Sequence, residues 1–455
     1  MVHATEFRAA QLIRGSLQRT FMSHLVFVET SGSGTHAIEY AKAAGHTVTL
    51  LYSPRYDFTA SREQRLLARK LADRTAELGE GDSPADLIAA LRAAGTDPGE
   101  VDAVLSTLAF GIPPAAALAA ALGVAGTSAE AVAIARDKGR CREALRAAGA
   151  PSLEFAVVTT VDEALAAAEA IGYPVIVKPV LGVGKAATTI TRSPQDVRTH
   201  FAEAAEAFAG LATGMSAHFD DRFIVEELAV GDLYSVEVAA DGTDVVALAS
   251  TLQKTASHDP VLELGCTVPT GLTPAEEDEM RSYAVQVCRV LGLDLGVFHV
   301  EMMRTARGFR LTEANPRIAG GALPETINAA ADQNMFEVLV NLFTGQPVPA
   351  PLRFTGAASH SVLGAATPGT VRADLPADWF AEVHDKIHSG WVRAEPGTRL
   401  DVMRGNFDRF GMIRVVAPDA DEAKSRCLEV KRTVERKLGI PLIREAGAEE
   451  GSAAP

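Results

Sequence analysis

A β-hairpin is predicted over Gly296-Val-Phe-His-Val-Glu-Met-Met-Arg-Thr-Ala-Arg-Gly-Phe-Arg-Leu-Thr-Glu-Ala-Asn-Pro-Arg-Ile-Ala-Gly-Gly321. Two short apolar runs of β-forming residues flank a turn at 305–308. Because side chains alternate along a strand, Glu313 and Asn315 share one face of the second strand. Folding the hairpin near residue 306 sets Glu301 opposite the 311–313 region.

A divalent cation site is the simplest explanation for these paired acids. Two carboxylates this close inside an apolar hairpin repel each other, and burial raises the pKa of at least one of them. Mg²⁺ relieves both effects, and it is usually held by one or two carboxylates together with substrate phosphates. Arg317 on the following loop is a fixed cation that can hold phosphate oxygens bidentately. The alternative is a solvated hairpin without a site, which the convergence of charged groups disfavours.

The pattern Glu301…Glu313-x-Asn315-x-Arg317, followed by Gly320-Gly321, resembles the metal-and-phosphate strand pair of the ATP-grasp superfamily. Among its members it resembles the carboxylate–amine ligases, such as the L-amino acid (dipeptide) ligases of the bacilysin synthetase type. The resemblance implies that Mg²⁺, with Mn²⁺ as an alternative ion, bridges the ATP phosphates on Glu301, Glu313 and Asn315. It also implies a catalytic Arg317 and a substrate site that includes Arg317, Gly320 and Gly321.

An ATP site is supported by further segments in the order that the resemblance requires. Residues 172–179 form a buried strand ending in Lys178, an unfavourable place for an ammonium without an anion. The turn at 182–185 is Gly-rich and can cover phosphates with its N–H groups, although a plain hairpin loop fits that pattern equally well. The ordered set implies ATP binding by Lys138, Lys178, Gly184, Lys185, Glu226, Glu227 and Leu228.

The segment 251–266 is implied to line the same site, with Lys254 near the phosphates and Glu263 near the amino substrate. An ordinary surface loop is the alternative for Lys254. Cys266 stands where the family pattern has a histidine, and we interpret it as a buried apolar side chain. Leu233 occupies the usual position of a ribose-binding acid, which leaves Asp232 as the neighbouring candidate.

The predicted fold class is multidomain, combining α/β and α+β parts around an ATP-grasp fold. A βαβ unit near the N-terminus carries the pattern G-x-G-x-x-A, but no acidic residue ends its second strand, which disfavours NAD binding. The predicted parts are an unordered extension at 1–23 (with Met22 as an alternative start), a Rossmann-like N-terminal domain at 24–125, an ATP-grasp domain at 126–350 with a lid at about 145–228, a small C-terminal α+β domain at 355–445 and a frayed tail at 446–455.

Composition narrows the class of partners. The chain has 455 residues and a net charge of −15, which argues against nucleic acid or an anionic membrane as a partner. Its four cysteines form no CxxC pair, and no run of 18 apolar residues occurs, so we expect a cytoplasmic enzyme with reduced thiols. Small-molecule substrates are the expected partners, and assembly as a homodimer is compatible with this interpretation.

The resemblance implies an ATP-dependent ligase. We expect it to join a carboxylate, an amino acid, to an amine, a second amino acid, through an acyl phosphate, with release of ADP and phosphate. An ATP-grasp carboxylase that activates bicarbonate is the first alternative. The second is a non-catalytic ATP-binding regulatory module, which the presence of both metal carboxylates disfavours.

Overall fold

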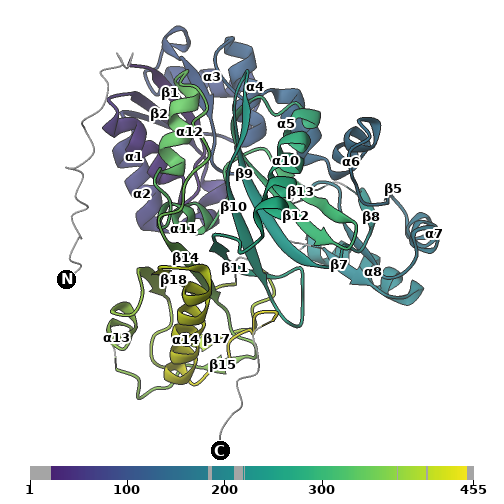
Figure 1. Cartoon of the computed structure of the whole chain (residues 1–455). Helices are drawn as coiled ribbons and strands as arrows, with labels where there is room; N and C mark the ends of the chain where they lie inside the picture. Colours follow the sequence, from purple (N-terminus) through teal and green to yellow (C-terminus); the bar gives the residue numbers. More distant parts are fainter. Residues whose placement is uncertain are drawn as a thin grey trace, which may run out of the picture.

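The computed structural model describes residues 22–182, 187–209, 219, 221–376, 378–405 and 408–447. The predicted site residues Gly184 and Lys185, most of the predicted extension at 1–23 and most of the predicted tail therefore lie outside the described residues. Three sheets of four or more strands make up the fold (Figure 1).

The N-terminal sheet is parallel and covered on both faces. Its strands stand in the order β3-β2-β1-β4, so the strand order reverses between β1 and β4. Alternate residues of β1 enter different cores: Leu25 packs with Ile38 of α1, whereas Val26 packs with Leu87 of α3. The all-apolar β1 is thus explained by burial on both faces. The elements are β1 (His24–Val28), α1 (Thr35–Ala43), β2 (Thr47–Tyr52), η1 (Pro54–Thr59), α2 (Arg62–Leu71), β3 (Arg74–Glu77), α3 (Pro84–Ala93), η2 (Pro98–Glu100), β4 (Ala103–Leu105) and α4 (Ile112–Leu122).

A second sheet, antiparallel in the order β5-β8-β6-β7, follows two short helices. Val175, Val177 and Val225 pack in one cluster with residues of α7 and α8. Side chains alternate, so Lys178 and Glu226 lie on the other face, away from these helices. The elements are α5 (Ala129–Arg136), α6 (Lys138–Ala147), β5 (Phe155–Val158), α7 (Val161–Ile171), β6 (Val175–Pro179), β7 (Thr189–Thr191), α8 (Pro194–Ala209) and β8 (Phe223–Glu227).

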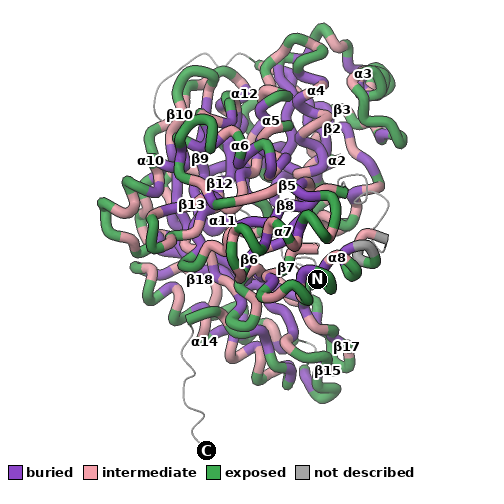
Figure 2. Tube along the Cα trace, turned by 90° about the vertical axis from the view of Figure 1, so that its right-hand side faces the viewer, coloured by how far each residue is buried: buried purple, intermediate pink, exposed green. Residues whose placement is uncertain are grey.

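The largest sheet is antiparallel and has the order β13-β12-β9-β10-β11-β14-β18-β16. It runs without a break from the hairpin β12–β13 into the C-terminal region, and its central strands are mostly buried (Figure 2). The elements are β9 (Asp232–Asp241), β10 (Val245–Thr255), β11 (Glu263–Val268), α10 (Pro274–Leu291), β12 (Leu295–Thr305), β13 (Gly308–Asn315), α11 (Leu323–Asn328), α12 (Met335–Phe343), β14 (Ala357–Leu363), β15 (Gly369–Thr370), α13 (Ala381–His384), β16 (Ser389–Val392), β17 (Arg399–Leu400), β18 (Gly411–Ala417) and α14 (Ala420–Leu438).

A buried ion cluster ties β10, β14 and α14 to the segment after α14. The Nζ atoms of Lys254 and Lys431 lie 3.5 and 3.2 Å from the carboxylate oxygens of Glu445. Ser361 donates a further hydrogen bond to the same carboxylate. Burial raises the pKa of Glu445, but the two lysines outweigh it and bring that pKa down to about 2.

Acid is therefore expected to weaken the C-terminal region through Glu445. Its pKa is lower folded than unfolded, so its charge stabilises the fold above a pH of about 4.5 and this contribution is lost as the pH falls toward 2. At pH 7, Glu445→Gln should destabilise the region by about 3 kcal/mol because two lysines lose their counter-charge. Urea unfolding followed by tryptophan fluorescence measures this region selectively, because both tryptophans, Trp379 and Trp391, lie within it.

The difference between wild type and Glu445→Gln should shrink as the pH is lowered from 7 to 3. Glu382→Gln is the control, since Glu382 forms an exposed pair with Lys437 and should contribute little at any pH. A difference that stays constant with pH would contradict the assignment.

Candidate active site

The predicted hairpin is present, and it sets the two predicted metal carboxylates directly opposite each other. Glu301 on β12 pairs with Glu313 on β13, and the register shifts between Glu301 and Met302. Asn315 is paired with His299 two positions further along the same hairpin. The β12–β13 edge of the large sheet lies beside β5 and β8 (Figure 1).

Two lysines predicted to bind ATP lie against β13. Lys138 Nζ lies 3.1 Å from Glu313 Oε1, and Lys178 Nζ donates to the carbonyl oxygen of Thr312 at 3.4 Å. Burial raises the pKa of Glu313, but Lys138 and Lys178 outweigh it and lower that pKa to about 2. Glu313 is therefore a carboxylate at neutral pH, with cations on its side of the hairpin.

Glu226 is the centre of a buried ion triplet. The sequence predicted Glu226 and Lys178 as site residues, but it did not predict the third member, Arg142. The Glu226 oxygens lie 2.7 Å from Arg142 Nε and 2.6 Å from Lys178 Nζ. Arg142 also donates to Thr312 O at 3.0 Å, which ties α6 and β8 to β13. Burial raises the pKa of Glu226, yet the two cations lower it overall. The buried ammonium of Lys178 is therefore paired with an anion of the protein itself, the Glu226 carboxylate.

His299 and Glu237 complete the hairpin site, and neither was predicted as a site residue. The His299 ring contacts Glu237 through Nδ1, and its Nε2 lies 2.8 Å from Glu301 Oε1. The other Glu237 oxygen accepts a hydrogen bond from the Ala319 amide at 3.1 Å. Burial lowers the pKa of His299, but the two carboxylates outweigh it and raise that pKa to about 10. Glu237 therefore contacts both His299, which is the partner of Glu301, and the loop that follows Arg317.

The donor set fits a Mg²⁺ site that needs phosphate to be complete. Two carboxylates and the Asn315 amide oxygen are hard oxygen ligands of the kind that Mg²⁺ prefers. Within the part of the chain that the structure describes, no group of three or more His, Cys, Asp and Glu side chains is arranged to hold a metal ion by itself. Such a partial set is typical of an ion shared with a nucleotide.

Arg317 is held at the mouth of the hairpin by neutral partners. Its Nη1 donates to Ile318 O at 2.9 Å and its Nη2 to Asn315 Oδ1 at 3.3 Å. The His299 amide fixes the Arg317 carbonyl at 2.9 Å. Burial lowers the pKa of Arg317, and the nearby carboxylates, Glu313 first among them, only partly offset this. The guanidinium thus keeps donor capacity for an anionic ligand.

The remaining predicted residues are spread more widely. Glu227 ends β8 in an exposed pair with Arg307, and Leu228 follows it half-buried. Lys254 is not brought together with Lys138 and Lys178, because its ammonium lies in the Glu445 cluster. Glu263 begins β11, close enough to raise the pKa of Arg317.

Two interpretations made beside the site can also be compared with the structure. Cys266 is fully buried, as interpreted, with its Sγ 3.4 Å from His360 Nδ1, and burial raises the pKa of this thiol to about 12. Asp232 begins β9 and is exposed, whereas Leu233 is buried.

Comparisons with known proteins identify the fold. Residues 171–325 match the ATP-grasp domain family. The chain has the ATP-grasp fold.

The individual relatives confirm the predicted resemblance to ligases of the bacilysin synthetase type. Alanine–anticapsin ligase of Bacillus subtilis is 25% identical over 253 residues, which cover 53% of this chain and 54% of the relative. An uncharacterised protein of Sinorhizobium fredii is 28% identical over 289 residues, or 63% of this chain and 58% of its own length. The chain thus spans little more than half the length of these curated relatives.

Solved structures show the same fold. The L-amino acid ligase from Bacillus licheniformis superposes with a TM-score of 0.72 at 16% identity, covering 92% of this chain and 98% of that one. The biotin carboxylase from Campylobacter jejuni gives a TM-score of 0.65 at 17% identity, with coverage of 94% and 93%. In the described residues no helix is both long and apolar enough to cross a membrane.

Proposed function

We propose that this protein is an ATP-dependent ligase that joins the carboxylate of one amino acid to the amine of another. The observation that carries the proposal is the direct pairing of Glu301 with Glu313, with Lys138 beside the second carboxylate and Arg317 at the mouth of the hairpin. Relatives named as amino acid ligases support the same reaction class.

Each group then has a role in phosphoryl transfer. Lys138 and Lys178 bind phosphate oxygens of ATP, and the β8 hinge at Glu227 and Leu228 lies where the base is bound. Glu301, Glu313 and Asn315 would hold Mg²⁺, which when bound neutralises charge on the transferring phosphoryl group. His299 keeps Glu301 in one orientation through the 2.8 Å contact.

The chemistry has two steps. A carboxylate oxygen attacks the γ-phosphorus of ATP, the bond from that phosphorus to the ADP oxygen breaks, and an acyl phosphate forms. The lone pair of the amine then attacks the acyl carbon, the carbon–oxygen bond to phosphate breaks, and the amine loses a proton as the amide forms. Arg317 stabilises the oxyanion of the tetrahedral intermediate, because its donors are not committed to a carboxylate.

The test is Mg²⁺-dependent release of ADP and phosphate over a matrix of single amino acids and pairs. Release that requires two amino acids, with a condensed product seen by mass spectrometry, is the expected result. Glu313→Gln should abolish it, while Glu276→Gln, which changes an exposed acid paired with Arg304, should not. Release that depends on bicarbonate instead would identify a carboxylase and reject the ligase.

A further inference from the structure

Arg409 is a half-buried arginine that contacts no counter-ion among the described residues. It lies just before β18, and its guanidinium has no hydrogen bond or ion pair to any residue in the described ranges. Its Nη1 lies 3.9 Å from the position that a Cβ on Gly321 would occupy. The C-terminal region therefore reaches the loop that follows the catalytic hairpin.

A second guanidinium lies at the neighbouring glycine. Arg317 Nη1 lies 3.7 Å from the position of a Cβ on Gly320. Gly320 and Gly321 are both exposed, and Gly321 has a φ of +62°, which disfavours a side chain there. Two arginines from distant parts of the chain thus lie beside Gly320 and Gly321, which carry no side chains that would fill the space next to them.

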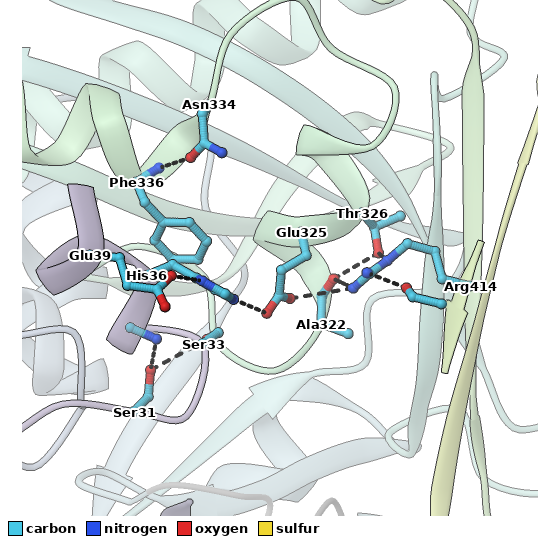
Figure 3. Close-up of polar contacts among 12 residues, drawn as sticks. Ser31, Ser33, His36, Glu39, Ala322, Glu325, Thr326, Asn334, Phe336 and Arg414 are labelled. Carbon is cyan, nitrogen blue, oxygen red and sulfur yellow. Dashed lines mark hydrogen bonds and ion pairs between the residues drawn. The ribbon is translucent and has the colours of Figure 1, made fainter. Parts of the chain in front are cut away.

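Glu325, whose charge acts on Arg409, is already paired with other groups. Glu325 on α11 lies 3.4 Å from Arg414 Nη2 and 3.9 Å from His36 Nε2, so it sits between a C-terminal strand and the N-terminal helix α1 (Figure 3). Arg414 is fixed there by further bonds to Thr326 Oγ1 at 3.0 Å and Ala322 O at 3.1 Å. The Glu325 carboxylate is therefore paired with Arg414 and His36.

Positive charge is in excess at this place. Burial and the neighbouring Arg393 lower the pKa of Arg409, and Glu325 offsets them only in part. Arg393 stacks on Trp391 and forms no ion pair within the described residues. A local surplus of guanidinium groups is notable in a chain of net charge −15, and such a surplus raises the local concentration of anions.

A carboxylate is the ligand that fits this place. Partial burial of an unpaired cation costs free energy. A carboxylate offsets this cost by accepting two parallel hydrogen bonds from one guanidinium. The carboxylate that reacts must lie beside Glu313 and Arg317, so a group held by Arg409 is a second carboxylate that does not react.

We propose that Arg409 binds the unreacted carboxylate of the amine substrate and so selects an amino acid or a peptide over a simple amine. The inference rests on the proposed ligase function and deepens it. An amino acid that attacks through its amino group keeps its own carboxylate throughout the reaction, so the recognition element is present in every step.

The experiment uses a pair of different amino acids that the wild type ligates, and it compares the amine substrate with its carboxamide, which lacks the negative charge. Arg409→Gln should raise the KM for the amino acid about 10- to 100-fold, the range expected for a hydrogen bond to a charged group. The KM for the carboxamide and the KM for ATP should stay unchanged. The KM of Arg409→Lys for the amino acid should lie between those of the wild type and Arg409→Gln, because lysine keeps the charge but not the planar fork.

Arg399→Gln is the matched control, since Arg399 is an exposed arginine of the same region that lies 3.7 Å from Asp401. Arg409→Gln removes no hydrogen bond or ion pair to a described residue, so its thermal midpoint should match that of the control. Calorimetric titration of the amine substrate, without turnover, should show the same loss of affinity.

Three outcomes would overturn the inference. They are an unchanged KM for the amino acid in Arg409→Gln, an equal rise for amino acid and carboxamide, and an effect confined to the substrate that donates the acyl group. A wild type that ligates no pair would instead reject the proposed function, so the two failures are distinguishable.

Discussion

Arg317→Ala is expected to lower the kcat of ligation by about 1,000-fold or more, the scale on which a guanidinium that stabilises transferring phosphoryl or oxyanion charge contributes. The side chain is held by Ile318 O and Asn315 Oδ1, which are neutral acceptors, so its charge remains available to the reacting groups. The KM for ATP should change far less, because Lys138 and Lys178 remain. Single-turnover formation of ADP and product measures the effect on chemistry without product release.

Arg304→Ala is the control for this prediction. Arg304 lies on the same hairpin, but it is exposed and pairs with Glu276. Its loss should leave kcat within about twofold, as expected for an exposed ion pair. An Arg317→Ala enzyme that retains a tenth of the wild-type kcat would show that this guanidinium only helps to bind substrate.

The largest expected effect on stability comes from Glu226→Gln. The amide keeps the shape of the side chain but leaves Arg142 and Lys178 as buried cations without a counter-charge. Breaking a buried ion pair in this way costs about 3–5 kcal/mol. Urea unfolding followed by far-ultraviolet circular dichroism measures the loss, because α6, β6 and β8 are held together by this triplet.

Glu227→Gln, one residue further on the same strand, is the matched control. Glu227 pairs with Arg307 in a setting where both side chains are partly exposed, so its replacement should cost less than about 1 kcal/mol. Equal stability of the two variants would contradict the assignment of a stabilising role to this triplet.

Local patterns in the sequence were sufficient for the hairpin and for several helices. The alternation around Glu301 and Glu313 predicted strands that the structure has, and it predicted their facing pair. Thr273 and Glu276 form the capping box that begins α10, and their spacing of three residues is a local sequence signal. These features depend on residues a few positions apart, whose geometry the backbone period fixes.

The partners of the charged residues could not be predicted in the same way. Lys178 at the end of a buried strand predicted the need for an anion, but only the packed structure identifies that anion as Glu226, which Arg142 shares from 84 residues away. Glu237 was not predicted as a site residue. It lies inside an apolar strand, where a single acidic residue indicates a buried charge that needs a partner. Its contact with His299 spans 62 residues.

The sequence by itself determined the hairpin with its paired carboxylates, the order of the segments that we propose bind the nucleotide, and the fold class, because each depends on residue type and short-range periodicity. Tertiary structure alone decided which charges meet. It placed Lys254 with Glu445, paired Glu226 with Arg142, and brought Arg409 to Gly321 beside Arg317. The physical reason is that a charge is satisfied by whichever opposite charge the packed sheets bring within a few ångströms, and separation along the chain carries no information about that distance.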